Sequence, residues 1–371
     1  MDTDNDLEIF LVTAPGLEDL LCAEAVEKGF KAPVTETGGV TVKGGWAEVW
    51  RANLELRGAG RVLVRVGTFR VMHLAQLDKR ARRFPWADFL RPDVSVRVEA
   101  TCAKSRIYHG GAAAQRISRA IQEEFGAPVS ADGEICIKAR IVDDLCTISI
   151  DTSGESLHKR GHKLAVSKAP MRENMAALIL RHCGYDGREP VVDPMCGSGT
   201  FVIEAAEIAA GLLPGRSRHF AFERLATFDD GVWQRMRRRE AGELPSVRFY
   251  GSDRDAGAIE MSCANAERAG VGALTEFSVQ PVSDLMAPDG PPGLVIVNPP
   301  YGARIGNTKS LNPLYRALGQ TLLTRFSGWR VGVVTNADSL VKASGLPIAQ
   351  TSAPVAHGGL RIKIYSTKPL P

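Results

Sequence analysis

Residues 294–301 have the sequence LVIVNPPY, and this stretch decides the fold class of the chain. Its four apolar residues in a row predict a strand that is buried on both faces, as in a parallel sheet covered by helices. The two prolines cannot continue the hydrogen bonding of a strand, so the chain must leave the sheet directly after it. A carboxamide, a proline carbonyl and an aromatic ring therefore stand at the carboxyl end of a strand, where open α/β sheets bind their ligands.

The four residues after this strand, Asn298, Pro299, Pro300 and Tyr301, suit the binding of a planar amine. The Oδ1 atom of Asn298 and the Pro299 carbonyl can both accept a hydrogen bond from one –NH2 group. Tyr301 offers a face for stacking, so the exocyclic amine of a nucleobase would fit. A strand-ending turn that binds nothing is the alternative interpretation, and other parts of the chain decide between the two.

The composition is that of a globular protein with two or three domains. The chain has 371 residues, 44% of them hydrophobic and 24% charged, and its net charge of +4 permits a nucleic-acid partner. Its 7 cysteines form no C-x-x-C pair, which disfavours disulfides and a zinc site, and we expect no metal. Residues 1–6 are acidic, unlike a signal peptide, and no apolar run approaches the ~18 residues of a membrane span. We therefore expect a cytoplasmic protein that does not contact a membrane, while the sequence gives no indication of its oligomeric state.

The amino-terminal part has a mixed α+β pattern of short elements. A first helix, with an apolar face from Leu17 to Ala25, follows the break at Pro15-Gly16. A second helix ends at Gly126, and a tight turn at Asp143-Asp144 joins the last two strands. The second helix is predicted over residues 112–125, and the strands over residues 8–12, 39–42, 61–69, 134–142 and 145–151.

Residues 152–169 differ from the sequence on both sides, because they are polar, basic and without periodicity. This composition predicts an interdomain linker, in which His158 and His162 face RNA or solvent rather than a metal ion. After Pro170, strands and helices alternate, which predicts a parallel sheet with crossover helices.

Residues 191–200, VVDPMCGSGT, predict a strand, a glycine turn and the start of a helix. Gly197 and Gly199 would let backbone amides approach a bound ligand closely. A dinucleotide fingerprint would need a third glycine where Val202 stands, and the lysine of a P-loop is absent from this stretch. Cys196 has no neighbouring base that could activate it, so we expect it to serve in packing.

Three carboxylates follow three predicted strands at Asp193, Asp253 and Asp284. Asp193 would repel a pyrophosphate and attract an ammonium group, although it could instead merely cap the helix. Asp253 stands where such folds bind both ribose hydroxyls, beyond an inserted segment at residues 211–244. Asp284 could accept a hydrogen bond from an adenine amine. A ligand with a cationic aminoacyl part fits this set better than NAD does.

These features resemble the class I S-adenosylmethionine-dependent methyltransferases. Within that class the chain is similar to the RNA methyltransferases of the guanine-N2 type, among them those of the large ribosomal subunit, that carry an amino-terminal THUMP domain. The run DTSGESLHKRG at residues 151–161 is the most informative, because it follows the THUMP domain in that family. The other matching runs are PGLE at 15–18, APMREN at 169–174, DPMCGSGT at 193–200 and NPPYG at 298–302.

The resemblance implies an α/β fold: a Rossmann-like class I methyltransferase domain with a reversed carboxy-terminal strand, preceded by α+β ferredoxin-like and THUMP regions. The reversed strand would lie within residues 329–335 and 360–366. The implied boundaries are 1–40 for the ferredoxin-like region, 41–152 for the THUMP domain, 153–169 for the linker and 170–371 for the methyltransferase domain.

The resemblance also implies S-adenosylmethionine as the cofactor and guanine N2 of ribosomal RNA as the methyl acceptor, with transfer RNA as the second candidate. Asn298, Pro299, Pro300 and Tyr301 would be the catalytic residues. The expected cofactor-binding residues are Asp193, Cys196, Gly197, Ser198, Gly199, Thr200, Asp253, Asp284, Asn298, Pro170 and Arg172.

Three basic patches are candidates for RNA binding. The first, Lys79, Arg80, Arg82 and Arg83, precedes Phe84 and Trp86, which could equally form a buried turn. The second, Lys104, Arg106 and Tyr108, is favoured because the resemblance places it in the THUMP domain. The third, Arg235, Arg237, Arg238 and Arg239 in the inserted segment, is interpreted as a solvated face.

Two alternatives stay open from the residues alone. An adenine-N6 DNA methyltransferase uses a similar Asn-Pro-Pro-Tyr, and the acceptor pair would serve adenine N6 or cytosine N4 as well as guanine N2. The amino-terminal half and residues 151–161 favour RNA. A protein that binds or assembles RNA and has lost activity is the other alternative, and the intact Asp193, Asp253, Asp284 and Asn298 argue against it.

Overall fold

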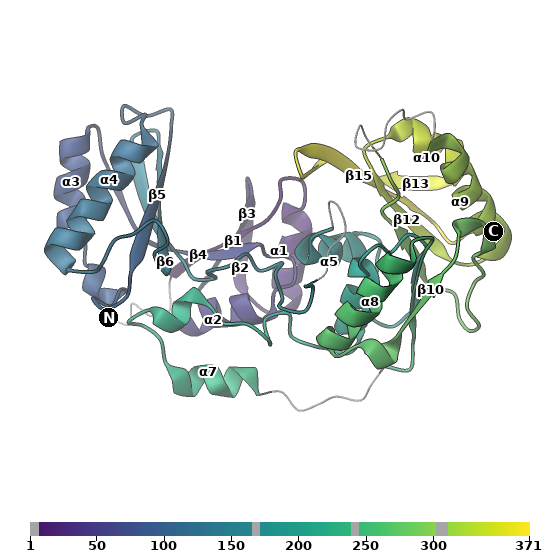
Figure 1. The fold of residues 1–371 in the computed structure, drawn as a ribbon. Helices are drawn as coiled ribbons and strands as arrows, with labels where there is room; N and C mark the ends of the chain where they lie inside the picture. Colours follow the sequence, from purple (N-terminus) through teal and green to yellow (C-terminus); the bar gives the residue numbers. More distant parts are fainter. Residues whose placement is uncertain (1–6, 165–170, 239–244, 302–310) are drawn as a thin grey trace. The chain divides into compact units, whose positions relative to one another are not determined.

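The computed structural model describes residues 7–164, 171–238, 245–301 and 311–371 (Figure 1). The described residues divide into two compact units. The amino-terminal unit consists of those within 1–13, 21–157 and 215–239, and the carboxy-terminal unit of those within 14–20, 158–214 and 240–371. Most of the inserted segment thus folds with the amino-terminal unit. Pro170 and Arg239, two of the residues singled out in the sequence, lie outside the described residues.

The described strands of the amino-terminal unit form one sheet in the order β2-β3-β1-β4-β7-β6-β5. Neighbouring strands are antiparallel except for β5 and β6, which are parallel. The strands are β1 (Leu7–Val12), β2 (Lys31–Glu36), β3 (Gly39–Gly44), β4 (Arg61–Arg70), β5 (Val96–Ala103), β6 (Ile135–Val142) and β7 (Leu145–Asp151). The expected domain boundary at residue 40 falls inside β3.

The amino-terminal half contains short helices between these strands. They are α1 (Glu18–Glu27), α2 (Trp46–Glu55), α3 (Leu74–Arg82), η2 (Trp86–Asp88) and α4 (Gly110–Ala120), and α4 continues as a π-helical turn, Ile121–Phe125. Gly126 ends this helix in the left-handed conformation, with φ of 88°. Asp143 and Asp144 both have positive φ, 51° and 60°, as a tight hairpin turn requires. The predicted helix at 112–125 and the predicted hairpin are therefore confirmed.

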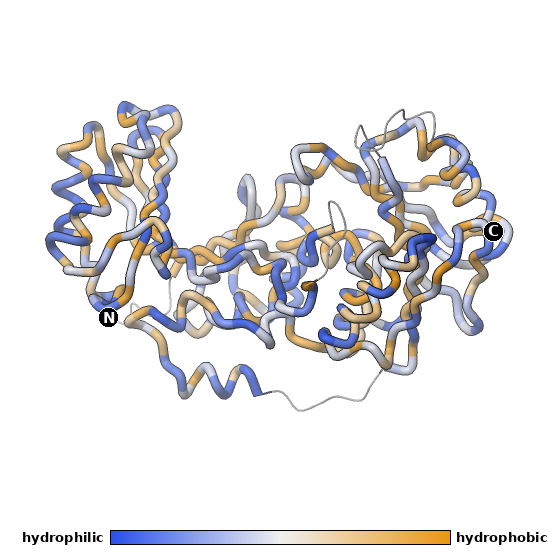
Figure 2. Tube along the Cα trace, viewed as in Figure 1, coloured by the Kyte–Doolittle hydropathy of each residue, from blue (hydrophilic) through white to orange (hydrophobic). Residues whose placement is uncertain are grey.

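The inserted segment contributes η4 (Ala221–Arg224) and α7 (Asp230–Arg237) to this unit. Trp233 of α7 is buried and lies edge-on to Phe222, with ring centroids 4.9 Å apart, and Phe222 stacks on Trp50 of α2. Hydrophilic and hydrophobic residues alternate along α7, as they do along α3 and α4 (Figure 2). The packing of these three aromatic rings explains why most of the inserted segment folds with the amino-terminal unit.

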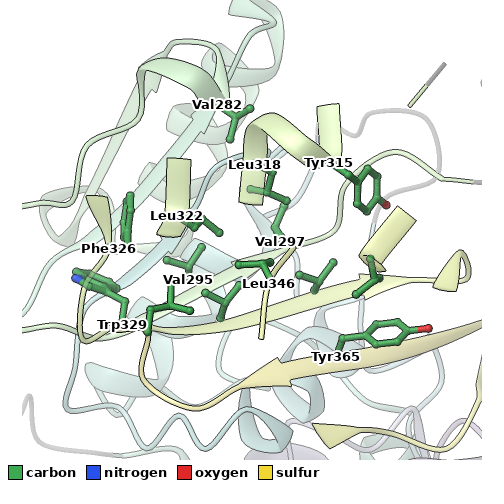
Figure 3. Packing of buried hydrophobic residues seen from close by; sticks show 14 of the residues in the cluster. Val282, Val295, Val297, Tyr315, Leu318, Leu322, Phe326, Trp329, Leu346 and Tyr365 are labelled. Carbon is green, nitrogen blue, oxygen red and sulfur yellow. The ribbon is translucent and has the colours of Figure 1, made fainter. Parts of the chain in front are cut away.

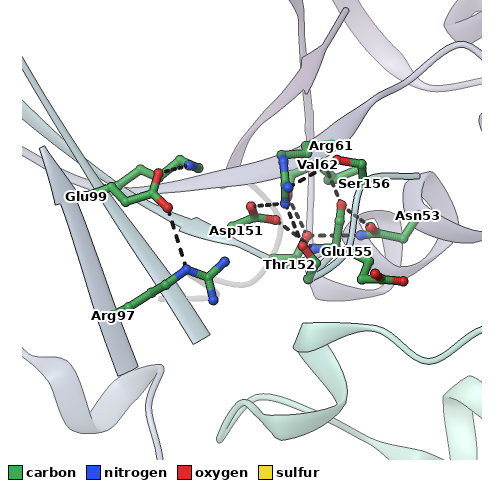
Figure 4. Close-up of polar contacts among 12 residues, drawn as sticks. Asn53, Arg61, Val62, Arg97, Glu99, Asp151, Thr152, Glu155 and Ser156 are labelled. Carbon is green, nitrogen blue, oxygen red and sulfur yellow. Dashed lines mark hydrogen bonds and ion pairs between the residues drawn. The ribbon is translucent and has the colours of Figure 1, made fainter. Parts of the chain in front are cut away.

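Residues Asp151–Ser153, at the end of β7, are fully buried and connect β4 to α2 (Figure 4). Asn53 of α2 donates from Nδ2 to Thr152 Oγ1 at 3.0 Å and accepts from Ser153 Oγ at 2.6 Å. The hydroxyl of Thr152 donates to the carbonyl of Val62 at 2.8 Å. The start of the run that predicted a solvated linker is therefore a buried, hydrogen-bonded part of the amino-terminal unit.

The carboxy-terminal unit contains a second sheet, whose described strands have the order β10-β9-β8-β11-β12-β15-β13, with β14 paired to β15. The strands from β10 to β12 are parallel, whereas β15 is antiparallel to both of its neighbours. The strands are β8 (Val191–Asp193), β9 (Phe249–Asp253), β10 (Thr275–Val279), β11 (Leu294–Val297), β12 (Arg330–Thr335), β13 (Ile348–Thr351), β14 (Val355–His357) and β15 (Leu360–Thr367). The expected Rossmann-like sheet with a reversed carboxy-terminal strand is confirmed.

Helices alternate with these strands, as the sequence predicted. They are α5 (Glu173–His182), α6 (Thr200–Ala209), α8 (Ala256–Ala269), α9 (Asn312–Arg325) and α10 (Asp338–Ser344), with the short helices η5 (Gly272–Leu274) and η6 (Val282–Asp284). All four residues of β11 are 0% exposed, which confirms the strand buried on both faces. Its Val295 and Val297 pack with Leu318 and Leu322 of α9 (Figure 3).

Replacing Asn53 with alanine is expected to destabilise the amino-terminal unit by about 2–3 kcal/mol, because Ser153 and Thr152 would lose buried hydrogen bonds. The measurement is urea unfolding followed by tryptophan fluorescence, since Trp46, Trp50, Trp86 and Trp233 belong to this unit. Gln115→Ala, on an exposed position of α4, is the control and should change stability by less than about 0.5 kcal/mol. Equal effects of the two substitutions would contradict the role of this network.

Candidate active site

A cavity of about 1030 Å³ lies in the carboxy-terminal unit at the carboxyl ends of the parallel strands. Asp193 ends β8, Asp253 ends β9 and Asn298 follows β11, and all three line it. Since these strands run in the same direction, their ends bring the three polar side chains to one edge of the sheet. The remaining walls come from the glycine loop, from residues after β10, from α9 and from the β14–β15 turn.

The glycine loop is held in shape by hydrogen bonds to its backbone. Gly197 and Gly199 have φ of 55° and 81°, which other residues adopt only with strain. The amide of Gly197 donates to Asp253 Oδ2 at 3.1 Å, and its carbonyl accepts from Ser262 Oγ at 2.9 Å. A Cβ atom at Gly199 would lie 3.1 Å from Ser262 Oγ, so close packing as well as φ requires glycine there.

Asp193 is 2% exposed and accepts a hydrogen bond at Oδ1 from the amide of Met195 at 3.1 Å. The pKa of this carboxyl is raised to about 8, mainly by burial, with the lowering effect of the Met195 amide opposed by the neighbouring charge of Asp253. A cationic group in the cavity would stabilise the ionised carboxylate. The electrostatics thus favour a ligand with a positively charged part.

Asn298 lines the cavity and carries an unsatisfied acceptor. Its Oδ1 atom is buried and has no hydrogen-bond partner among the described residues. A buried acceptor without a partner is uncommon in folded proteins, because it costs about 1–3 kcal/mol. A donor supplied by a ligand would remove this cost.

The Asn298–Tyr301 turn is braced by a residue that the sequence analysis missed. Tyr315 of α9 is 0% exposed, and its hydroxyl lies 3.3 Å from the Pro300 carbonyl and 3.2 Å from Thr335 Oγ1. Burial raises the pKa of this phenol to about 12, so it stays a neutral donor. No local pattern marks this tyrosine, since it occupies an apolar position of a helix.

Most of the expected cofactor residues line the cavity, whereas Arg172 and Asp284 do not. Asp193, Cys196, Gly197, Ser198, Thr200, Asp253 and Asn298 line it together with Pro299, Pro300 and Tyr301. Arg172 is exposed at the start of α5, and the neighbouring Met171 lines the cavity instead. Asp284 is exposed in η6, where Val282 and Ser283 are the lining residues. Roles for Arg172 and Asp284 stay predictions.

Cys196 is 7% exposed and its Sγ lies 3.8 Å from Ser262 Oγ. Burial raises the pKa of this thiol, so it is a neutral group that packs in the loop. Further lining residues that the sequence did not single out are Phe201, Arg254, Gln280, Leu311, His357 and Leu360. They stand at the ends of strands or on helices without a recognisable motif, so only the fold identifies them.

The first basic patch is partly neutralised within the amino-terminal unit. The guanidinium of Arg82 forms ion pairs with Asp78, Glu123 and Glu124 at 2.6–2.9 Å, and these hydrogen bonds raise its pKa. Trp86 is 2% exposed and donates from Nε1 to the Ala81 carbonyl at 2.8 Å. The buried-turn interpretation of this segment is therefore correct for Trp86, while Lys79, Arg80 and Arg83 stay exposed.

The second basic patch is an exposed loop with a fixed backbone. Tyr108 is 86% exposed, the Arg106 side chain is 68% exposed, and Lys104 is exposed as well. Asp144 of the β6–β7 turn holds this loop, because it accepts from the Arg106 amide at 2.8 Å and donates its own amide to Ser105 Oγ at 3.0 Å. An aromatic ring and two cations thus face solvent from a preformed loop.

The third patch lies on α7. Arg235 and Arg237 belong to this helix, and Arg238 follows it. Arg237 donates to the Arg216 carbonyl at 2.8 Å and lies over the ring of Trp233, so part of this charge serves the packing of the insert.

One interpretation of the basic run after β7 is wrong. His162 was expected to face RNA or solvent, but it is 6% exposed, with Nδ1 3.9 Å from Glu207 Oε1. Burial lowers the pKa of this histidine, which keeps it mainly neutral. The physical reason for the error is that its neighbour Glu207 belongs to α6, far along the sequence.

The described residues contain neither a cluster of metal-ligating side chains nor a membrane-spanning helix. Within them, no group of three or more His, Cys, Asp or Glu side chains could hold a metal ion. No helix in this part of the chain is both long and apolar enough to cross a membrane.

A Rossmann-like sheet with a reversed carboxy-terminal strand and a glycine loop beside a cavity are the features of the class I methyltransferases, and the Asn-Pro-Pro-Tyr turn lines the same cavity. Family models agree with this. Residues 160–361 match the model described as RMKL-like, methyltransferase domain. Residues 8–63 match the RlmL ferredoxin-like domain, and residues 73–151 match the THUMP domain. The chain belongs to the RMKL-like methyltransferase family, as the resemblance predicted.

Similar proteins support the same family. A relative from Psychromonas ingrahamii, named ribosomal RNA large subunit methyltransferase K/L, is 34% identical over 92% of this chain. The chain spans about half of that relative, 47% of its length. A Synechocystis protein named as an RNA methyltransferase is 31% identical, over 95% of this chain and 94% of its own. A methyltransferase solved in complex with SAH is 27% identical, covers 99% of both chains and superposes with a TM-score of 0.87.

The raised pKa of Asp193 predicts how pH changes the stability of the ligand-free protein. The folded value, about 8, exceeds the ordinary value of 3.8, so the folded state holds a proton that the unfolded state releases. The stability that this bound proton gives the folded state is fully present below pH ~4 and is lost as pH rises through about 8. Asp193→Asn should therefore gain melting temperature relative to wild type between pH 5 and 8, by an amount that grows with pH. A difference that does not vary with pH would contradict the raised pKa.

Proposed function

We propose that this protein is an S-adenosylmethionine-dependent RNA methyltransferase that acts on an exocyclic base amine, guanine N2 of ribosomal RNA. The observation that carries the proposal is the unpartnered Oδ1 atom of Asn298, which lines the same cavity as Asp193 and Asp253. Transfer RNA is the second candidate substrate.

The residues of the cavity fit this cofactor. S-adenosylmethionine would supply a methyl group bound to a sulfonium and is therefore a cationic ligand with an amino group, a ribose and an adenine. Asp193 would hold the ammonium group, and Asp253 would accept from the ribose hydroxyls. The residues after β10, with Asp284, would face the adenine. SAH, the ligand of the similar solved methyltransferase, is what S-adenosylmethionine becomes after methyl transfer.

The size of the cavity supports a second occupant. Its volume of about 1030 Å³ stands at the upper end of small-molecule sites, which span ~300–1,000 Å³. A base that acts as methyl acceptor must leave its stack to enter such a site. Tyr301 would stack on the flipped base, which is worth about 1–3 kcal/mol.

Asn298 and Pro299 would then orient the amine. The lone pair of an aryl amine is delocalised into the base, so the nitrogen is a weak nucleophile. Two acceptors for its N–H bonds, Asn298 Oδ1 and the Pro299 carbonyl, would favour a tetrahedral nitrogen with its lone pair directed at the methyl group. The nitrogen loses its proton after transfer, when that proton has become acidic, so no general base is needed beforehand. Alignment and local electrostatics would provide most of the rate enhancement.

The amino-terminal unit supports RNA as the substrate. It contains the residues that match the THUMP model, and both relatives carry the name of an RNA methyltransferase. The exposed loop with Lys104, Arg106 and Tyr108 is the favoured contact, because it combines cations with a stacking ring. The acceptor pair alone would equally serve adenine N6 of DNA, so the choice of RNA depends on this unit.

Replacing Asn298 with alanine is the direct test of the proposed chemistry. We expect turnover on ribosomal RNA from cells lacking this protein to fall about 100-fold or more, because the amine loses an orienting acceptor. The affinity for SAH, measured by calorimetry, should stay within about twofold of wild type, since Asp193, Asp253 and the glycine loop provide most of the expected cofactor contacts and are retained. Gln350→Ala, at an exposed position of β13, is the matched control. Turnover equal to wild type in Asn298→Ala would refute the assignment, and absence of both activity and SAH binding in the wild type would favour an inactive RNA-binding protein.

Reversing the charges of Lys104 and Arg106 tests the RNA surface. Each cation that contacts a phosphate adds about 0.7–0.9 to the slope of log affinity against log salt, so the double Glu variant should flatten this slope by about 1–2. The measurement is RNA binding by fluorescence anisotropy between 50 and 300 mM KCl. Lys31→Glu, on the exposed edge of β2, is the control in the same unit. An unchanged slope would contradict this assignment and show that RNA contacts another surface.

A further inference from the structure

In the run His158–Lys163, directly after the amino-terminal unit, Arg160 and His162 are buried in the carboxy-terminal unit, whereas Lys159 and Gly161 are exposed. Arg160 is 2% exposed, and its Nη1 lies 2.8 Å from Glu204 Oε2 and 3.6 Å from Glu207 Oε2. Arg268 of α8 donates from Nε to the His162 carbonyl at 2.8 Å. These contacts fix the backbone of the run at α6, although its sequence predicted a solvated linker.

Lys163, at the end of this run, makes three polar contacts. Its Nζ donates to the Met171 carbonyl at 2.7 Å and to Thr200 Oγ1 at 2.8 Å, and lies 3.4 Å from Glu173 Oε1. An ammonium group has three N–H donors, so these acceptors satisfy it completely. The side chain is only 9% exposed, which means that little water competes for these bonds.

Two of these three acceptors belong to residues in the wall of the active-site cavity. Met171 and Thr200 line the cavity, whereas Lys163 does not. Thr200 is the first residue of α6, directly after Gly199 of the glycine loop, and Glu173 is the first residue of α5. Lys163 therefore joins the amino-terminal ends of two helices where they border the cavity.

We propose that Lys163 is a positioning residue for the methyl donor: through its bonds to Met171 and Thr200 it fixes the cavity wall against which the donor binds. The inference rests on the proposed function, because it takes the cavity to be the donor site. It assigns a role to the basic run at residues 158–163 that differs from RNA binding. Burial lowers the pKa of the ammonium group, and the carboxylate of Glu173 acts in the opposite direction. The ion pair with Glu173 at 3.4 Å makes the hydrogen bonds of this lysine charge-assisted.

The test is calorimetric titration of SAH into the full-length protein and its variants. Lys163→Met should weaken SAH binding about tenfold or more, since two charge-assisted bonds to the wall are lost. The variant also leaves Glu173 buried without its cation, so Lys163→Met combined with Glu173→Gln removes that charge and isolates the effect of the lost donors. Lys363→Met is the matched control, because Lys363 pairs with Asp338 at 2.9 Å and neither residue lines the cavity.

Steady-state kinetics distinguishes positioning from a structural role. The KM for S-adenosylmethionine should rise about tenfold in both Lys163 variants, while kcat at saturating donor stays within about twofold. SAH affinity equal to wild type in the folded double variant would overturn the proposal and leave the proposed function intact. A double variant that does not fold would also overturn it, since Lys163 would then serve folding alone. Failure of the wild type to bind SAH would instead refute the proposed function.

Discussion

Burial of the parallel sheet on both faces is the constraint on which the rest of the structure depends. Strand β11 tolerates only apolar residues, so a polar group can stand only where such a strand ends. Asp193, Asp253 and Asn298 occupy these positions and face one cavity. The same burial raises the pKa of Asp193 and leaves Asn298 Oδ1 without a partner, so the free site is unfavourable until a ligand with positive charge and hydrogen-bond donors binds.

The run at residues 151–163 contributes buried residues to both units. Its first part, Asp151–Ser153, is buried in the amino-terminal unit and bonded to Asn53. In its last part, Arg160 and His162 are buried in the carboxy-terminal unit beside α6. Because both ends are hydrogen-bonded in place, the run is structural, and its similarity to a family motif reflects packing as much as chemistry.

Much of the fold and part of the site could be predicted from the sequence, because their signals are local. The apolar run of β11, the glycine turn at Gly197–Gly199 and the hairpin at Asp143-Asp144 are each determined by neighbouring residues. Tyr315 and Lys163 were missed, and Arg160 and His162 were misinterpreted, because their partners are distant. Thr200 lies 37 residues from Lys163, and Glu204 lies 44 residues from Arg160. A basic run with distant countercharges has the same sequence pattern as a solvated one.

The most direct test of the central claim is mass spectrometry of nucleosides from cells with and without this protein. Large-subunit ribosomal RNA, transfer RNA and DNA should be digested separately and compared. The account predicts that one N2-methylguanosine disappears from the ribosomal RNA and returns when the protein is restored. Unchanged N2-methylguanosine together with a loss of N6-methyladenine from DNA would contradict it.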